Sequence, residues 1–316
     1  MNWRKLRKLL SREGAHLALN RRLRSLAQKH LSVPLNVLSS YDFVLSRDCP
    51  PCLPVRETGR LQINWLIQGI AKAHGGLFNV YRTIQQLESW GHENHVYVLG
   101  SLHEGSDEAA RFVKRHYFEV KAKIELISSH IKDSDALIAT SWPTAYAARS
   151  IANTVEKFYF VQDLEYMFYA PGSLHEMAKH TYQFGFRGIT AGTWIADVLK
   201  RDFDMECLPF GFSYDRNKYD SAGDRLLTTQ KKRVLFYARP ETERRGFELG
   251  VLTLSLVAAR LPDVEFVMVG FSPGSLKLPF PVLYPGVLPV DSLGALYRSC
   301  DVALVLSHTN LSLLPL

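Results

Sequence analysis

The chain has 316 residues, 47% of them hydrophobic and 22% charged, which is an ordinary globular composition and long enough for two domains. Its four cysteines are too few for a disulfide framework, and it has no apolar run of the about 18 residues that a membrane-spanning helix needs. These features exclude a disulfide-stapled secreted domain and an integral membrane protein, and they favour a reducing, cytoplasmic setting.

The positive charge is concentrated at the N-terminus. Residues 1–34 carry nine Lys or Arg and one Glu, a charge of +8 out of a net +7, so the rest of the chain carries −1. Leucines recur among the arginines at roughly helical spacing, which predicts a basic helical leader that lies on an anionic membrane surface. A charged helix that packs on the body of the protein fits the same pattern. We expect no nucleic-acid partner, because no aromatic stacking platform accompanies the charge.

Residues 61–210 alternate between strand-like and helix-like segments, as in a parallel α/β sheet. Strands are predicted at 61–69, 95–100, 135–140, 157–163 and 188–192, and helices at 77–90, 143–154 and 193–202. The preceding residues 35–60 are rich in proline and lack periodicity, which predicts a linker. The segment 61–210 is therefore predicted to be an N-terminal Rossmann-like domain.

A second alternation occupies residues 211–316. Strands are predicted at 233–240, 264–270, 282–287 and 301–307, and helices at 246–261 and 291–299. This pattern predicts a second Rossmann-like domain. Because doubly wound sheets bind ligands at the carboxyl ends of their strands, the loops after the strands are where functional residues are expected.

Two such loops carry candidate residues. Gly75 and Gly76 come just before a predicted helix, where glycines let the backbone approach a ligand and helix-start amides attract phosphate, although a tight turn explains them equally well. In the second domain Arg239, Arg244 and Arg245 follow a strand and precede a helix. Guanidinium groups are planar, permanently charged forks, so this cluster is predicted to neutralise a leaving diphosphate.

Together these stretches resemble GT-B fold glycosyltransferases. They are similar to glycosyltransferase family 4, and most like its rhamnosyltransferase-type branch in bacterial cell-surface polysaccharide synthesis. The resemblance covers about residues 61–316 and rests on "HGGLFNVYRTIQQLESWGHENHVYVL", "VLFYARPETERRGFEL", "LPDVEFVMVG" and "YPGVLPVDSLGALYRSCDVALVLS". It implies two Rossmann-like domains that face each other across a cleft, the first on the acceptor side and the second binding the nucleotide-sugar donor.

The resemblance assigns roles residue by residue. Arg239 takes the place of the family's arginine and Arg245 that of its lysine, so both are implied to hold the donor diphosphate. Gln162 and Asp163 stand where many members have His-Asp, which implies a catalytic position, although an amide cannot shuttle a proton. The remaining donor-binding candidates fall in the matching stretches of the second domain: Gly270, Ser307 and Asn310.

Asn310 occupies the place of the first of two family glutamates, and the second would fall at residue 318. We therefore expect the donor domain to be incomplete at its C-terminus, as in a truncated chain.

The implied reaction is a hexosyltransferase-type transfer with retention at the anomeric carbon. The donor is a nucleotide-diphosphate sugar, with rhamnose preferred, and the acceptor is a glycan or lipid-linked glycan. No metal or other cofactor is expected. The chain is expected in the cytoplasm, or at the inner face of the plasma membrane if residues 1–34 bind lipid.

Two alternatives stay open. One is a nucleotide-sugar-binding or glycan-binding protein without activity, which the missing glutamates favour. The other is a dinucleotide-dependent oxidoreductase. It is disfavoured, because no Gly-x-Gly-x-x-Gly follows a strand with an acidic residue about 20 positions further on.

Overall fold

The computed structural model describes residues 50–55, 59–71, 74–100, 105–127, 131–211, 214–216, 218–271 and 277–309. The predicted leader 1–34, most of the predicted linker 35–60 and Asn310 lie outside these residues. The chain divides into two compact units. The first contains the described residues up to Ile70 with Ile84–Arg115 and Glu119–Lys157, and the second contains Ala71–Thr83, His116–Phe118 and the described residues from Phe158 onward.

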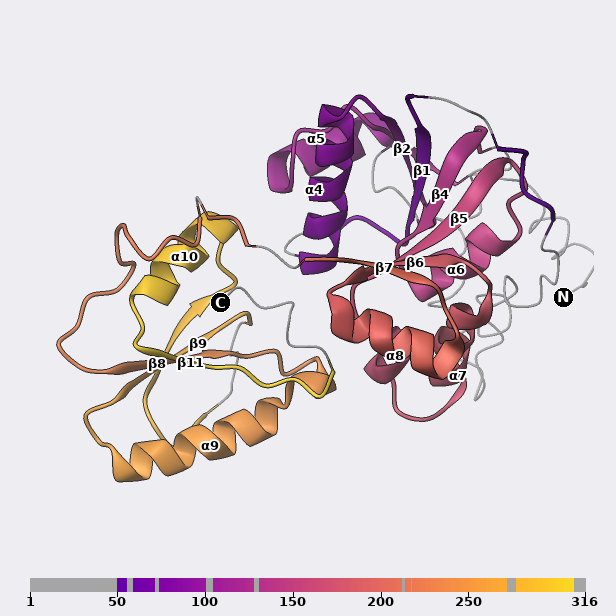
Figure 1. The fold of residues 1–316 in the computed structure, drawn as a ribbon. Helices are drawn as coiled ribbons and strands as arrows, with labels where there is room; N and C mark the ends of the chain where they lie inside the picture. Colours follow the sequence, from indigo (N-terminus) through magenta and orange to yellow (C-terminus); the bar gives the residue numbers. More distant parts are fainter. Residues whose placement is uncertain are drawn as a thin grey trace, which may run out of the picture. The chain divides into compact units, whose positions relative to one another are not determined.

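A seven-stranded sheet occupies the first two thirds of the described chain, with strand order β3-β2-β1-β4-β5-β6-β7 (Figure 1). Its strands are β1 (Gln62–Ile67), β2 (Glu93–Val98), β3 (Lys123–Leu126), β4 (Ser134–Ala139), β5 (Thr154–Val161), β6 (Arg187–Ala191) and β7 (Cys207–Phe210). The strand β1 is parallel to both β2 and β4, and β6 is parallel to both β5 and β7. The strand β1 lies between two strands, and its residues 63–67 are all buried, which explains why all of them except Asn64 are apolar.

The helices of this part are α4 (Gly75–Ser89), α5 (Ser106–His116), α6 (Trp142–Arg149), α7 (Ser173–His180) and α8 (Thr193–Phe203), with 3-10 turns at Glu165–Phe168 and Thr181–Gln183. The predicted helices 77–90 and 193–202 are confirmed. The helix predicted at 143–154 is wrong at its end, since α6 ends at Arg149 and β5 begins at Thr154. The strands β3 and β7 and the helices α5 and α7 were not predicted from the sequence.

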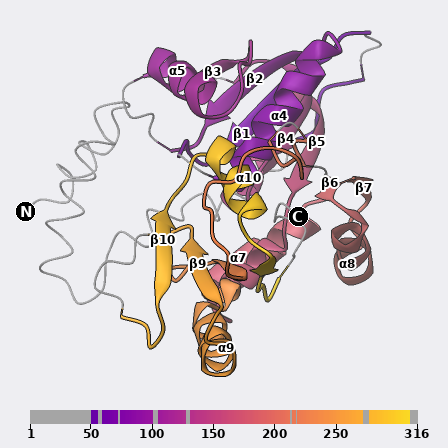
Figure 2. The same ribbon diagram turned by 90° about the vertical axis from the view of Figure 1, so that its left-hand side faces the viewer.

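The second sheet has four parallel strands in the order β10-β9-β8-β11. They are β8 (Arg233–Tyr237), β9 (Glu265–Val269), β10 (Val282–Gly286) and β11 (Val302–Leu304), with helices α9 (Phe247–Arg260) and α10 (Val290–Arg298) and a 3-10 turn at Glu243–Arg245. All four strands lie within predicted segments. Figure 2 shows β9 and β10 side by side, with α9 below β9.

The helices α9 and α10 cover opposite faces of the second sheet (Figure 1). Side chains of a strand alternate between its faces. Phe236 of β8 packs with Leu254 of α9, whereas its neighbour Leu235 packs with Leu296 of α10. A Cβ on Gly250 of α9 would lie 2.1 Å from the ring of Phe236, so this glycine lets the helix approach the sheet closely.

None of the helices in the described ranges is both long enough and apolar enough to span a membrane.

Candidate functional site

The carboxyl ends of β8 and β9 place Arg239 and Gly270 side by side. Arg239 donates a hydrogen bond from Nη1 to the hydroxyl of Tyr237 at 3.0 Å, and its Cζ lies 5.9 Å from the centre of that ring. Gly270 has φ +105°, and a Cβ there would lie 3.0 Å from the carbonyl oxygen of Ala238 and 3.4 Å from Cδ of Arg239. Glycine is therefore required here both by the backbone conformation and by the close approach of the Arg239 turn.

Arg245 is a buried guanidinium with an unused donor. Its residue is 8% exposed, and its Nη1 is buried without a hydrogen-bond partner in the described part of the chain. Burial lowers the pKa of Arg245, and the negative charge of Asp163 partly opposes that effect. A buried, charged donor without an acceptor is costly in the free chain, and it is well suited to hold an anion.

Arg244, the neighbour of Arg245, also has a buried donor atom without a partner in the described residues. Its Cζ lies 3.7 Å from the centre of the Phe168 ring, a cation–π contact, and its buried Nε has no hydrogen-bond partner within the ranges described. Burial lowers the pKa of Arg244, and the positive charge of Arg245 lowers it further. The two arginines thus form a concentrated positive site that favours binding of a multiply charged anion.

Asp163 supplies a negative charge beside the arginines. It is 2% exposed. Its Oδ1 accepts a hydrogen bond from the amide of Leu164 at 2.8 Å, and its Oδ2 accepts one from the hydroxyl of Thr309 at 3.0 Å. Since both carboxylate oxygens are engaged, Asp163 is placed to orient the site and balance its charge.

The side chain of Gln162 forms hydrogen bonds with the start of α4. Its Nε2 donates to the carbonyl of Gly76 at 3.1 Å, and its Oε1 accepts from Nδ2 of Asn79 at 2.9 Å. A Cβ on Gly76 would lie 3.2 Å from Nε2 of Gln162, so the glycine makes room for this contact. Gly75 is the first residue of α4, where the leading amides of a helix have no intrahelical acceptor.

His74, directly before the glycines, was not assigned a role by the sequence analysis. Its Nδ1 accepts a hydrogen bond from the amide of Leu77 at 3.3 Å, so the imidazole caps the start of α4. Burial lowers the pKa of His74, and the positive charges of Arg239 and Arg244 lower it further. The lowered pKa favours the neutral form of the imidazole near the arginines.

The loop after β11 is tied to the arginine turn. The amide of His308 donates to the carbonyl of Arg244 at 2.8 Å, and the hydroxyls of Ser307 and Thr309 lie 3.3 Å apart. The structure thus brings the predicted residue Ser307 close to the arginines, together with Thr309, which sequence reasoning missed. Asn310 lies beyond the described residues.

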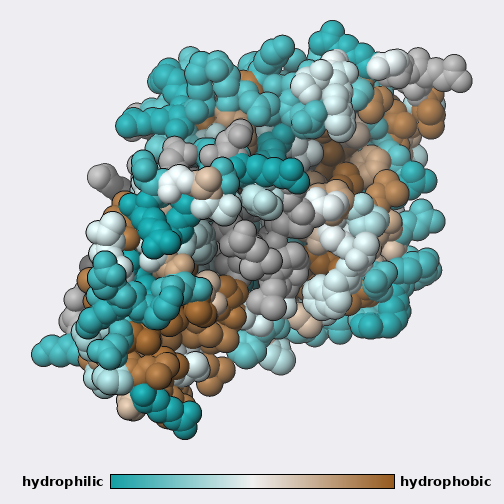
Figure 3. Space-filling view, turned by 60° about the vertical axis from the view of Figure 1, so that its left-hand side comes forward, coloured by the Kyte–Doolittle hydropathy of each residue, from teal (hydrophilic) through white to brown (hydrophobic). Residues whose placement is uncertain are grey.

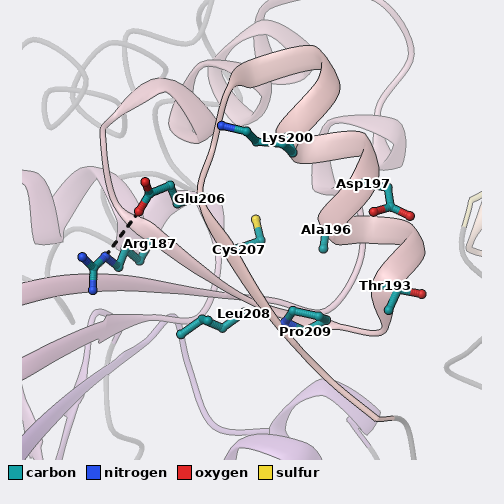
Figure 4. Close-up of a pocket in the computed structure, with 9 residues that line it drawn as sticks. All are labelled: Arg187, Thr193, Ala196, Asp197, Lys200, Glu206, Cys207, Leu208 and Pro209. Atoms are coloured by element: carbon teal, nitrogen blue, oxygen red, sulfur yellow. Dashed lines mark ion pairs between the residues drawn. The ribbon is translucent and has the colours of Figure 1, made fainter.

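A separate pocket of about 550 Å³ lies between α8 and the strands β6 and β7 (Figure 4). Nine residues line it: Arg187, Thr193, Ala196, Asp197, Lys200, Glu206, Cys207, Leu208 and Pro209. Arg187 and Glu206 form an ion pair at 3.6 Å on one side of the pocket (Figure 4). Burial raises the pKa of Cys207 to about 11, so the thiol stays protonated and is a poor nucleophile. The pocket contains none of the predicted site residues.

Residues 232–316 match a family model described as the C-terminal domain of WsaF. The curated O-antigen biosynthesis protein RfbC of Myxococcus xanthus is 28% identical over 313 residues, a match that covers 91% of this chain and 24% of that protein. The chain thus spans about a quarter of the length of this relative.

Two solved structures resemble this fold over most of the chain. A glycosyltransferase from Rickettsia africae has a TM-score of 0.54 at 13% identity, with 79% of this chain and 74% of that one covered. TarM has a TM-score of 0.59 at 7% identity, with 79% and 80% covered. The chain has the α/β fold of GT-B glycosyltransferases, as the sequence predicted.

Proposed function

We propose that this chain is a glycosyltransferase that moves a sugar from a nucleotide-diphosphate donor to a glycan in surface polysaccharide synthesis. The observation that carries the proposal is the buried Nη1 of Arg245, which has no hydrogen-bond partner among the described residues and lies beside Arg244. It is at the end of the sheet where doubly wound folds bind nucleotides. The likeness to an O-antigen biosynthesis protein supports the pathway class.

The proposed mechanism is electrostatic. The bond between the anomeric carbon and the diphosphate breaks, and its electron pair leaves with the diphosphate. Arg239 and Arg245 stabilise that developing charge, and the amides at the start of α4 supply further donors. The acceptor hydroxyl forms the new bond on the same face of the sugar, which retains the configuration, and its proton passes to the leaving phosphate.

The roles of Gln162 and Asp163 fit this route. The amide of Gln162 is already engaged by Gly76 and Asn79, so it orients the loop and does not exchange a proton. Asp163 orients Thr309 and balances part of the arginine charge. The leaving phosphate therefore serves as the base. No metal or other cofactor is part of the proposal.

The finer assignments rest on the sequence resemblance. They are a deoxythymidine diphosphate rhamnose donor, a glycan or lipid-linked glycan acceptor, and a position at the inner face of the plasma membrane through residues 1–34. No nucleic-acid partner is proposed.

A second candidate is a nucleotide-sugar-binding protein without turnover. It is favoured by the engaged amide at Gln162, since a titratable group is absent at that position, and by Asn310 in the place of a glutamate. This candidate predicts the same binding of a nucleoside diphosphate, with no transfer.

Titration calorimetry with nucleoside diphosphates, followed by an assay for nucleoside diphosphate released from nucleotide sugars, tests the proposal. We expect Arg239→Ala to weaken binding by about tenfold to a hundredfold, since one charge-assisted hydrogen bond to the phosphate is lost. Arg225→Ala removes a charge from an exposed arginine in a loop before β8 and serves as the control.

Each outcome separates the candidates. Binding with sugar transfer supports the enzyme, and binding without transfer supports the binding protein. Preference for a nicotinamide dinucleotide would favour an oxidoreductase. An Arg239→Ala chain that binds as tightly as the control would refute the diphosphate assignment.

A further inference from the structure

The helix α9 is apolar on its outer surface as well as on the surface that faces its sheet. Leu254 packs against the sheet and is 1% exposed, whereas Leu249, Leu252 and Leu256 are 53%, 62% and 60% exposed. Ala259, one turn further on, is exposed as well. Figure 3 shows hydrophobic side chains gathered on the surface in its lower part, where α9 lies. Single exposed leucines are common, but a row of them along one helix indicates a contact surface.

The outer residues are spaced as in a coiled coil. Leu249, Leu252, Leu256 and Ala259 are separated by three, four and three residues, the a and d positions of two heptads. The hydroxyl of Thr253, which flanks the row, donates to the carbonyl of Leu249 at 2.8 Å. Covering the row would therefore leave this hydroxyl with its partner, so burial carries little polar cost.

We propose that α9 pairs antiparallel with α9 of a second copy of the chain about a two-fold axis at the level of Leu254. In this register Leu252 lies opposite the partner's Leu256, and Leu249 lies opposite the partner's Ala259. Each large side chain at the ends of the row meets a small one, and the two central layers are leucine on leucine. A two-fold contact of this kind needs a self-complementary surface, which this spacing provides.

Charge favours the antiparallel arrangement. The row is flanked by Glu248 at the start of α9 and by Arg260 at its end. Two antiparallel copies place an acidic residue and a basic residue at the same level at each end, and their helix dipoles oppose each other. Two parallel copies would place like charges together at both ends. The occupant that best matches the surface is therefore the same surface of another copy.

A charge-swap experiment tests the register. Sedimentation velocity is measured for the native chain, for Leu252→Glu, for Leu256→Lys and for an equimolar mixture of the two variants. Each variant alone is expected to weaken the dimer by at least about tenfold, because a charge enters both central layers. In the mixture, the glutamate of one chain meets the lysine of the other and the second layer is leucine on leucine, so dimers are expected to return.

The matched control is Leu283→Glu, which makes the same change at an exposed leucine of β10 that is 46% exposed. It should associate like the native chain. Thermal melts check that the variants fold, which is expected because the altered residues are exposed. A native chain that stays monomeric at its highest soluble concentration overturns the proposal and assigns the row to a different partner or to another part of a longer polypeptide. A dimer that resists both substitutions, or a mixture that stays monomeric, also overturns it.

Discussion

Replacing Arg245 by methionine should remove nucleoside-diphosphate binding without weakening the free chain. The side chain of Arg245 is almost fully buried, and a buried polar group without a partner costs about 1–3 kcal/mol, a cost that methionine avoids while it keeps the apolar stem. The lost attraction to Asp163 offsets part of this gain. We therefore expect the free energy of unfolding without ligand to rise by between zero and about 2 kcal/mol.

Urea unfolding with and without a nucleoside diphosphate measures both effects. Ligand at about 100 times its dissociation constant should stabilise the native chain by about 2.7 kcal/mol and leave Arg245→Met unchanged. The control is Arg233→Met at the opposite end of β8. Arg233 is 2% exposed, and its guanidinium donates to Glu265 at 2.8 Å and to the carbonyl of Ser299 at 3.0 Å, so its loss should cost about 3–5 kcal/mol.

Arg233 and Arg245 are similarly buried, but their replacement by methionine is expected to change the free energy of unfolding in opposite directions. An Arg245→Met chain that unfolds as easily as Arg233→Met without ligand, and that is still stabilised by the diphosphate, would show that Arg245 is a structural residue. Its buried, unused donor would then have no role in diphosphate binding.

Three further predictions concern the surroundings of the arginines. Gly270→Ala should weaken both stability and diphosphate binding more than Gly286→Ala does. Both glycines have positive φ, but only a Cβ at Gly270 would press on Arg239. Calorimetry and urea unfolding compare the two variants, and equal effects would contradict the contact between residue 270 and Arg239. Gln162→Leu should lower kcat/KM by about tenfold without changing the pH profile, because an amide does not titrate; a shifted profile would argue for proton transfer at this position. Burial and the charge of Arg239 lower the pKa of His74, so the unfolded chain binds a proton at this imidazole more readily than the folded chain does. The contribution of His74 to the free energy of unfolding should therefore be complete above about pH 6.5, the pKa of a free histidine, and decrease as the pH falls below it. His74→Gln should flatten that decrease in acid titrations of unfolding, and an unchanged slope would assign it to other groups.

The strands that the sequence predicted best are those made mostly of apolar residues. The strands β1 and β8 lie between two neighbours and are largely buried, so their composition is fixed by burial on both faces. The strand β7 lies at the edge of its sheet, carries Pro209 and exposes 61% of Leu208. Proline has no amide hydrogen to donate, so it is tolerated in an edge strand. Because proline is otherwise rare in strands, its presence argued against predicting a strand here.

The site was predictable only in part, for a similar reason. The residue types and their position after a strand were enough to single out Arg239 and Arg245. The contact between Thr309 and Asp163 joins residues 146 positions apart, so neither spacing nor periodicity contains it. The engagement of Gln162 by Asn79, 83 positions away, was hidden in the same way, and it decides whether the amide is free to act on a substrate.

The two ends of the second sheet show how ligand binding differs from stabilisation. At the amino end of β8, the buried Arg233 has its donors satisfied by a carboxylate and by carbonyls, which is what folding alone requires. At the carboxyl end, Arg244 and Arg245 keep two of the four unpartnered buried polar side-chain atoms found in the described residues, and Gly246 beside them has φ +54°. Unsatisfied buried charge costs stability and persists where another requirement outweighs that cost, whereas a glycine adopts positive φ without strain. A bound diphosphate would satisfy the donors of Arg244 and Arg245 and offset this cost. The carboxyl end of the sheet is therefore the place to look for the substrate, and the amino end, where the buried Arg233 has its partners, is not.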